Sequence, residues 1–147
     1  MPAHDPKHTY TDSSRLYIVN DKVMTHSFAE DAKAHAHSVA KLNVERGRAA
    51  LAEQTANAAR DAAEIKAKAA RVVEHTMADA YCDCAIKWGF DASESAAAAR
   101  VAMETAHAAF VVADAALDGR HATFIAAIRA TKKLDGELRT LLIERAR

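Results

Sequence analysis

The stretch AAAARVAMETAHAAFVVADAAL, residues 96–117, decides the fold of this chain. Its apolar residues recur at alternating intervals of three and four positions, which places them along one side of an α-helix. The residues with this spacing are Ala96, Ala99, Met103, Ala106, Phe110, Ala113 and Leu117. Alanine is the strongest helix former, because it loses no side-chain entropy on folding. The stretch therefore predicts a helix with one continuous apolar seam.

The same spacing continues on the far side of Gly119. The residues that keep the phase are Phe124, Ala127, Leu134, Leu138 and Leu141. Because the spacing stays in phase across Gly119, it favours one continuous helix over about 92–146. Residues 118–119 are the point where that helix would bend. The sequence leaves open whether Gly119, or Gly47 in the first half, bends its helix.

A second long helix is predicted before this one, over about 28–88. Both prolines, Pro2 and Pro6, lie ahead of it, and Ser27 with Glu30 fits a capping box. Gly89 supplies the end, and a turn is expected at 89–91. Its matching stripe is Leu42, Ala49, Ala52, Ala56, Ala59, Ala63, Ala70, Val73, Met77, Ala80 and Cys84. We therefore expect an all-α fold, a long antiparallel helical hairpin or coiled-coil-like bundle formed by 27–147.

Residues 1–26 are predicted to be an irregular, extended N-terminal arm. The arm contains one β-prone patch, Leu16, Tyr17, Ile18 and Val19. Because an isolated strand is not stable alone, the arm either docks on a neighbouring subunit or stays loose.

Each predicted helix also carries a second apolar face. On the first helix it consists of Leu51, Ala58, Ala62, Ile65, Ala69 and Val72, and on the second of Val101, Ala108, Val112 and Ala115. A two-helix hairpin needs only one face per helix, so the second faces predict a larger bundle. Packing against other chains is favoured over folding back at Gly47 and Gly119. Trp88 and Phe90, beside the turn, are either an aromatic plug or an exposed docking tip.

The charge balance argues against nucleic acid as the main partner. Lys plus Arg and Asp plus Glu both number 20, whereas nucleic-acid binding proteins normally carry a basic excess. The charges are unevenly placed: residues 72–118 carry −6, residues 28–71 carry +2 and residues 119–147 carry +4. In a hairpin this makes the turn end acidic and the open end basic, which favours stacking head to tail, or antiparallel beside a copy of the chain. Compensation of the helix dipole is the alternative explanation.

Few residues suggest catalytic or metal chemistry, and no cofactor is expected. Glu104 and His107 have the Glu-x-x-His spacing of ferritin-like di-iron bundles, but the motif occurs once. Cys82 and Cys84 lack the second ligand pair of a zinc site, so we interpret them as reduced packing residues. A Gly-rich phosphate loop and a nucleophile elbow are both absent from the sequence, so no enzymatic activity is expected.

These features together predict a non-enzymatic structural or assembly protein that oligomerises through Ala-rich helical seams. A phage or virus particle component is the most concrete version, since arms and long helices suit repetitive assemblies. Two alternatives are a ferritin-like metal-binding bundle and a helical stress or surface-coating protein. The start of the chain lacks the apolar core of a signal peptide, and the apolar stretch 105–117 is too short to span a bilayer. We therefore expect a virion or cytoplasmic location.

Overall fold

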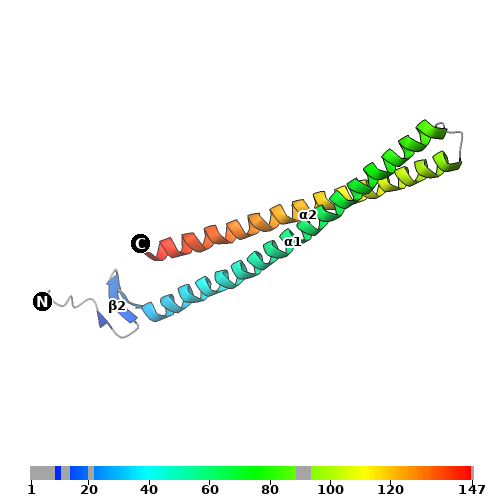
Figure 1. Ribbon diagram of the computed structural model, residues 1–147. Coiled ribbons are helices and arrows are strands. Elements are labelled where there is room, and N and C mark those ends of the chain that lie inside the picture. The colour runs from blue at the N-terminus through cyan, green and yellow to red at the C-terminus, as the bar shows by residue number, and fades with distance from the viewer. Residues whose placement is uncertain (1–8, 11–13, 20–21, 89–93, 147) are drawn as a thin grey trace. The chain divides into compact units, whose positions relative to one another are not determined.

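The protein is a hairpin of two long α-helices, as the computed structural model shows (Figure 1). It describes residues 9–10, 14–19, 22–88 and 94–146, with side chains at 30–88 and 94–145. Helix α1 runs from Phe28 to Trp88 and helix α2 from Glu94 to Ala146. The prediction of an all-α antiparallel hairpin is thereby confirmed.

The chain divides into two compact units. One unit comprises residues 1–47 and 134–147, and the other comprises residues 48–133. The second unit contains the C-terminal part of α1 and the N-terminal part of α2, and most of the features described below lie within it.

The N-terminal segment forms a small antiparallel sheet of three strands in the order β1-β2-β3. Strand β1 is Thr9–Tyr10, β2 is Ser14–Val19 and β3 is Lys22–Ser27. The β-prone patch therefore lies in the central strand, where Leu16 pairs with both Thr9 and Thr25. The expected arm was irregular with one such patch, and the two flanking strands were not predicted.

Both helices run through the positions where a bend was considered. Gly47 lies inside α1, and Gly119 and Gly136 lie inside α2. A Cβ atom added at any of the three would meet nothing within 4 Å, so close packing in the hairpin does not require these glycines. α1 begins directly after Ser27, where the capping box predicted the N-cap. The Ser27 side chain and the predicted turn at 89–91 lie outside the described part.

Helix α2 turns the predicted seam toward α1. All twelve seam residues predicted for this helix, from Ala96 to Leu141, are buried or half-buried. Ala96 and Ala106 are the most enclosed, at 0% and 7% exposure. We call this set the α2 inner seam. Its prediction from the three-four spacing is confirmed.

Helix α1 confirms only one of its two predicted seam columns. The column with seven-residue spacing from Leu42 to Cys84 is half-buried throughout. The other column was wrong at Ala52, Val73 and Ala80, whose side chains are exposed. The residues that turn inward in its place are Glu53, Arg60, Ala67, Glu74 and Tyr81. Together with the confirmed column they form the α1 inner seam.

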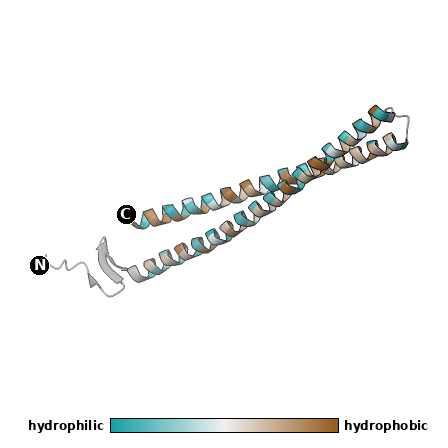
Figure 2. Cartoon of the chain, in the orientation of Figure 1, coloured by the Kyte–Doolittle hydropathy of each residue, from teal (hydrophilic) through white to brown (hydrophobic). Residues whose placement is uncertain are grey.

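The core between the helices is thin. Among the described side chains only four alanines are buried: Ala67, Ala85, Ala96 and Ala106. Larger apolar residues are at best half-buried, and hydrophobic positions are interleaved with hydrophilic ones along both helices (Figure 2). Since an alanine removes little apolar surface from water, the hairpin gains a modest stabilisation from its own core.

Candidate interaction surface

Long polar side chains of α1 hold the second unit together across the inner seam. The Arg60 guanidinium lies 4.5 Å from the centre of the Phe124 ring, and that of Arg71 lies 5.9 Å from the Phe110 ring. Such cation–π contacts stabilise by about 0.5–1 kcal/mol at exposed sites. They explain why Arg60 occupies a seam position: its long side chain covers an aromatic ring that an alanine would leave exposed.

Glu74 and His107 form a further cross-helix contact, with Glu74 Oε1 2.6 Å from His107 Nδ1. The Glu74 side chain is 19% exposed, so this carboxylate belongs to the seam. The three contacts set residues 60, 71 and 74 opposite 124, 110 and 107, which fixes the antiparallel register of this unit.

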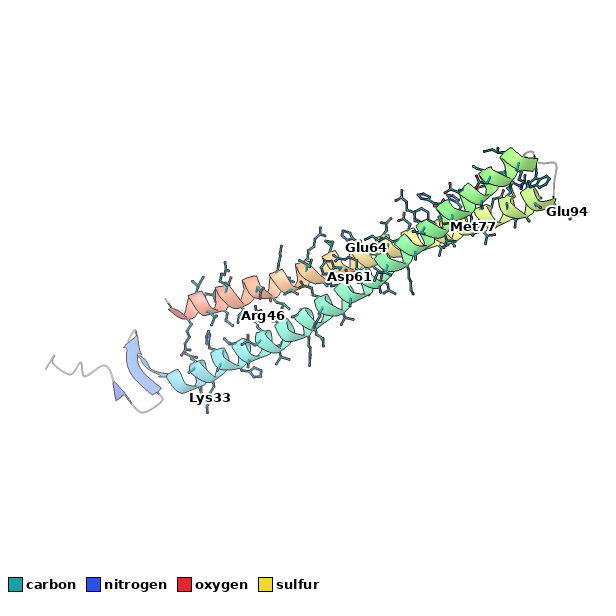
Figure 3. The ribbon with its side chains drawn as sticks, viewed as in Figure 1. Lys33, Arg46, Asp61, Glu64, Met77 and Glu94 are labelled. Atoms are coloured by element: carbon teal, nitrogen blue, oxygen red, sulfur yellow. The ribbon has the colours of Figure 1, made fainter. Side chains whose placement is uncertain are left out.

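The other unit has a comparable contact of its own, between the Arg46 guanidinium and the Asp135 carboxylate. Arg46 is labelled in Figure 3, where side chains project all along both helices. Both groups are about half exposed, so the pair contributes at most about 1 kcal/mol.

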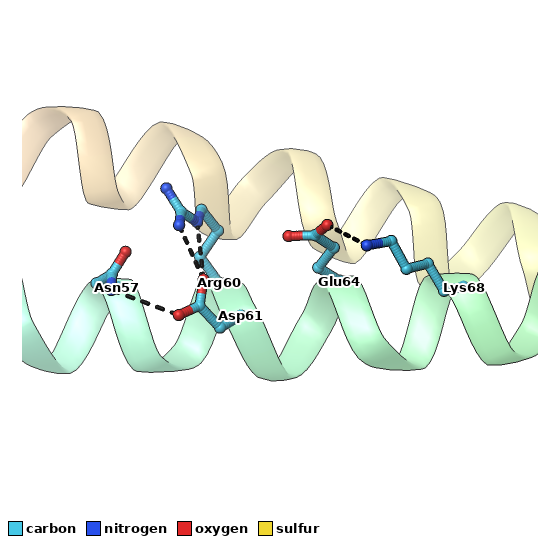
Figure 4. A network of polar contacts seen from close by, with 5 residues as sticks. All are labelled: Asn57, Arg60, Asp61, Glu64 and Lys68. Atoms are coloured by element: carbon cyan, nitrogen blue, oxygen red, sulfur yellow. Dashed lines mark hydrogen bonds and ion pairs between the residues drawn. The ribbon is translucent and has the colours of Figure 1, made fainter.

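A polar network follows one side of α1 (Figure 4). Arg60 donates to Asp61 at 2.8 Å, the Asn57 amide donates to the same carboxylate at 3.4 Å, and Lys68 lies 2.6 Å from Glu64. The hydrogen bond and the positive charge of Lys68 lower the pKa of Glu64. This side of α1 is hydrophilic and borders the inner seam through Arg60, in contrast to the next one.

A continuous uncharged stripe lies on the outside of α1. Its members keep alternating three- and four-residue spacing, and every one is exposed. They are Leu51, Thr55, Ala58, Ala62, Ile65, Ala69, Val72 and Thr76. Leu51, Ile65 and Val72 are 64%, 69% and 65% exposed. We call this set the α1 outer stripe. It has the pattern of a helix–helix seam without a partner.

The hydroxyl groups in this stripe are satisfied within the helix. Thr55 donates to the Leu51 carbonyl at 2.9 Å, and Thr76 donates to the Val72 carbonyl at 2.8 Å. Neither threonine hydroxyl therefore needs an external partner. The stripe can be covered by an apolar surface at little cost in lost hydrogen bonds.

Helix α2 carries an equivalent stripe, which we call the α2 outer stripe. It consists of Ala98, Val101, Thr105, Ala108, Val112, Ala115, Gly119, Ala122 and Ala126, all exposed. Val101 and Val112 are 58% and 69% exposed, and Thr105 donates to the Val101 carbonyl at 2.8 Å. The α2 outer stripe is thus also uncharged and internally satisfied.

Each outer stripe is the inner seam shifted by two residues. Ala56 and Ala63 face inward where Ala58 and Ile65 face outward, and Phe110 faces inward where Val112 faces outward. Two residues correspond to about 200° around a helix, so the second stripe lies nearly opposite the first. Ala62 and Val112, one residue from each outer stripe, also line a groove of this unit beside the inner-seam residues Ala63 and Ala113.

The structure exposes every interaction residue that the sequence predicted on the helices and that it describes. These are Leu51, Ile65, Val72, Trp88, Val101 and Val112. Trp88 is 56% exposed, with the Lys87 ammonium 5.2 Å from its ring. Phe90 and the side chains of Leu16, Tyr17, Ile18 and Val19 lie outside the described part. Sequence reasoning missed Thr55, Thr76, Thr105 and the small residues that complete the stripes; their three-four spacing was the available signal.

The two weak metal candidates point to different partners. Arg100 Nε lies 3.7 Å from Glu104, whereas His107 contacts Glu74 on the other helix. Within the described residues, no three His, Cys, Asp or Glu side chains converge as they would around a metal ion. Cys82 is exposed and Cys84 half-buried, both as free thiols. The ferritin-like alternative gains no supporting geometry.

By length and composition α2 is apolar enough to cross a membrane. An 18-residue window in it reaches a mean hydropathy of 1.2, and 11% of that window is buried. A single such helix is weak evidence, since an Ala-rich helix can pass this test without a membrane. The observation again describes an apolar helix surface that the hairpin leaves uncovered.

The chain matches no protein-family model, no curated protein and no solved structure.

Proposed function

We propose that this protein is a non-enzymatic structural subunit that assembles through its outer stripes. The observation that carries the proposal is the pair of uncharged, exposed three-four stripes on α1 and α2. A hairpin does not need them for its own fold, because each helix already meets the other through an inner seam. A second seam on the same helix is used when further helices pack against it.

The surface of the chain supports the same conclusion. Twelve large apolar side chains are exposed in the described part. Fully burying one valine, leucine or isoleucine side chain stabilises by about 1.5–3 kcal/mol, so association would add what the thin core lacks.

The more specific proposal is a component of a phage or virus particle. It rests on an analogy of architecture, because a repeating particle needs subunits with several seams, and an N-terminal segment that reaches a neighbour adds a further link. The sheet formed by β1, β2 and β3 would be that link. The proposal predicts that purified chains form assemblies of regular symmetry visible by electron microscopy.

Absolute mass in solution tests the general proposal. The full-length wild type and the Ile65→Glu variant are compared by size-exclusion chromatography with light scattering. Ile65 is 69% exposed, so a glutamate there leaves the hairpin folded while placing a charge in the centre of the α1 outer stripe. We expect a discrete oligomer for the wild type and a lower mass for the variant.

Ile86→Glu is the matched control. Ile86 is 80% exposed on the same helix but lies beyond the uncharged stripe, so the oligomer should keep its mass. A wild type that is monomeric at every concentration would contradict the proposal. Equal loss of mass in both variants would also contradict it, because the outer stripe would then have no special role.

A further inference from the structure

We propose that the α1 outer stripe packs against the same stripe of a second copy of this chain, antiparallel, about a two-fold axis between Ala62 and Ile65. This inference rests on the proposed function and specifies its partner, surface and orientation. The axis lies at the middle of the eight stripe residues, four on each side. A two-fold contact uses the same patch on both copies, so the patch must be complementary to itself.

The side-chain sizes in the stripe have that self-complementarity. With the axis between Ala62 and Ile65, Leu51 faces Thr76 of the second copy and Thr55 faces Val72. Ala62 faces Ile65, and Ala58 faces Ala69. Each large residue therefore meets a smaller one, as in interlocking seams, and only the Ala58–Ala69 pair is small on both sides. A parallel pairing would set Leu51 against Leu51 and Ala58 against Ala58. The contact would then be crowded at the large residues and empty at the small ones.

The charges that end the stripe favour the same orientation. Continuing the three-four spacing, the stripe is preceded by Arg48 and followed by Asp79 and Asp83. About the proposed axis Arg48 lies opposite Asp79 of the second copy, and this pair forms twice. In a parallel pair, each charge would meet its own kind. Opposite charges at both ends set orientation and exclude the alternative register.

The charge distribution of unit 48–133 agrees. Residues 72–109, which surround the turn, contain six acidic and two basic side chains. Residues 48–62 and 119–133, which face each other at the other end of this unit, contain six basic and two acidic ones. In an antiparallel pair, the end of this unit with net charge −4 lies beside the end of the second copy's unit with net charge +4. In a parallel pair, ends with the same sign of charge would lie side by side.

Disulfide trapping in the full-length chain tests the geometry. In a Cys82→Ser, Cys84→Ser background, we introduce Ala58→Cys into one sample and Ala69→Cys into another. About the axis, residue 58 of one copy meets residue 69 of the other, whereas two residues 58 lie about 16 Å apart at 1.5 Å per residue. A disulfide needs Cα atoms within about 7 Å. Mild oxidation should therefore link the mixture and leave each single variant unlinked.

A charge exchange gives an independent readout of orientation. Arg48→Glu or Asp79→Arg alone should raise the dissociation constant about threefold to tenfold, because each creates two like-charge contacts. The double variant should return it to within about twofold of the wild type. An intact far-ultraviolet circular dichroism signal confirms that each variant is folded.

The outcomes separate this inference from the proposed function. Cross-links within each single variant would establish a parallel pair and overturn the inference while leaving the assembly proposal intact. An oligomer with no cross-link in any sample, and no response to the charge exchange, would assign the contact to another surface and also overturn it. A chain that stays monomeric overturns both proposals. If that monomer also binds phosphatidylcholine vesicles, the covering partner is a bilayer.

Discussion

The two sides of helix α1 have nearly the same spacing and opposite surroundings. The inner seam includes Arg60 and Glu74, which meet partners on α2, while the outer stripe includes Leu51 and Ile65, which meet solvent. In this helix the more apolar side is thus the one that meets no partner among the described side chains. The inner seam is partly polar, and its long side chains contact residues of α2. The α1 outer stripe is uncharged. The difference indicates that folding and association use separate faces of the same helix.

The largest expected effect is on association, from charge in the outer stripe. Ile65→Glu combined with Val72→Glu should raise the dissociation constant of the oligomer at least 100-fold, since both carboxylates would lose water on contact. Sedimentation velocity over a range of concentrations measures it. The hairpin itself should keep its helicity, because both positions are about two-thirds exposed. A large loss of helix content would mean that the outer stripe also supports the fold.

A truncation in the inner seam should act on the fold. Phe124→Ala removes the half-buried ring under Arg60 and should lower the free energy of unfolding by about 2 kcal/mol, less than for a fully buried ring. Urea unfolding of a variant that is already monomeric, Ile65→Glu, isolates this effect. Phe124→Ala with unchanged stability would show that the seam does not hold the helices together.

The contrast between the seams also shows how far sequence reasoning reaches. The α2 inner seam could be read from spacing alone, because its members from Ala96 to Leu141 are almost all apolar. In α1 the alanines are so frequent that two apolar columns compete for one seam. Spacing then favoured Ala52, Val73 and Ala80, which the structure exposes. Nothing local reveals that Arg60 is drawn inward by an aromatic ring 64 residues away.

The same limit applies to the N-terminal segment. The patch Leu16–Val19 has a clear β preference and lies in β2, as its composition indicates. Strand β3 reads KVMTHS, with polar residues that match no strong strand pattern alone. Its pairing is a property of two segments together, so single-segment propensity could not supply it. The outer stripes, by contrast, were largely predictable, since exposure follows once the inner seam is fixed.

A smaller effect is expected from the Arg60 side chain itself. Arg60→Ala removes the cation–π contact and its covering stem while keeping Phe124, and should cost about 1 kcal/mol of unfolding free energy. Arg60→Lys keeps the charge but loses the planar group, so it should recover part of that loss. Urea unfolding measures both. An Arg60→Ala variant as stable as the wild type would place this arginine in solvent.

The smallest effect belongs to the polar network of α1. Lys68 lowers the pKa of Glu64, so the pair contributes stability above the ordinary pKa of 4.5, and the contribution is lost as pH falls through the lowered pKa. Lys68→Ala should therefore shift the melting temperature slightly at pH 7 and not at pH 2. Thermal melts at the two pH values measure this. A shift that persists at pH 2 would show that Lys68 acts by packing.

The measurement that tests the separation of the two faces most directly is the melting temperature as a function of protein concentration. Partners that bind only the folded hairpin stabilise it by mass action, so the wild-type value should rise steadily over a hundredfold increase in concentration. Ile65→Glu should melt at one temperature throughout, near the wild-type value at the lowest concentration. Melting of the wild type that is independent of concentration would contradict the account, because the outer stripes would then stay in solvent.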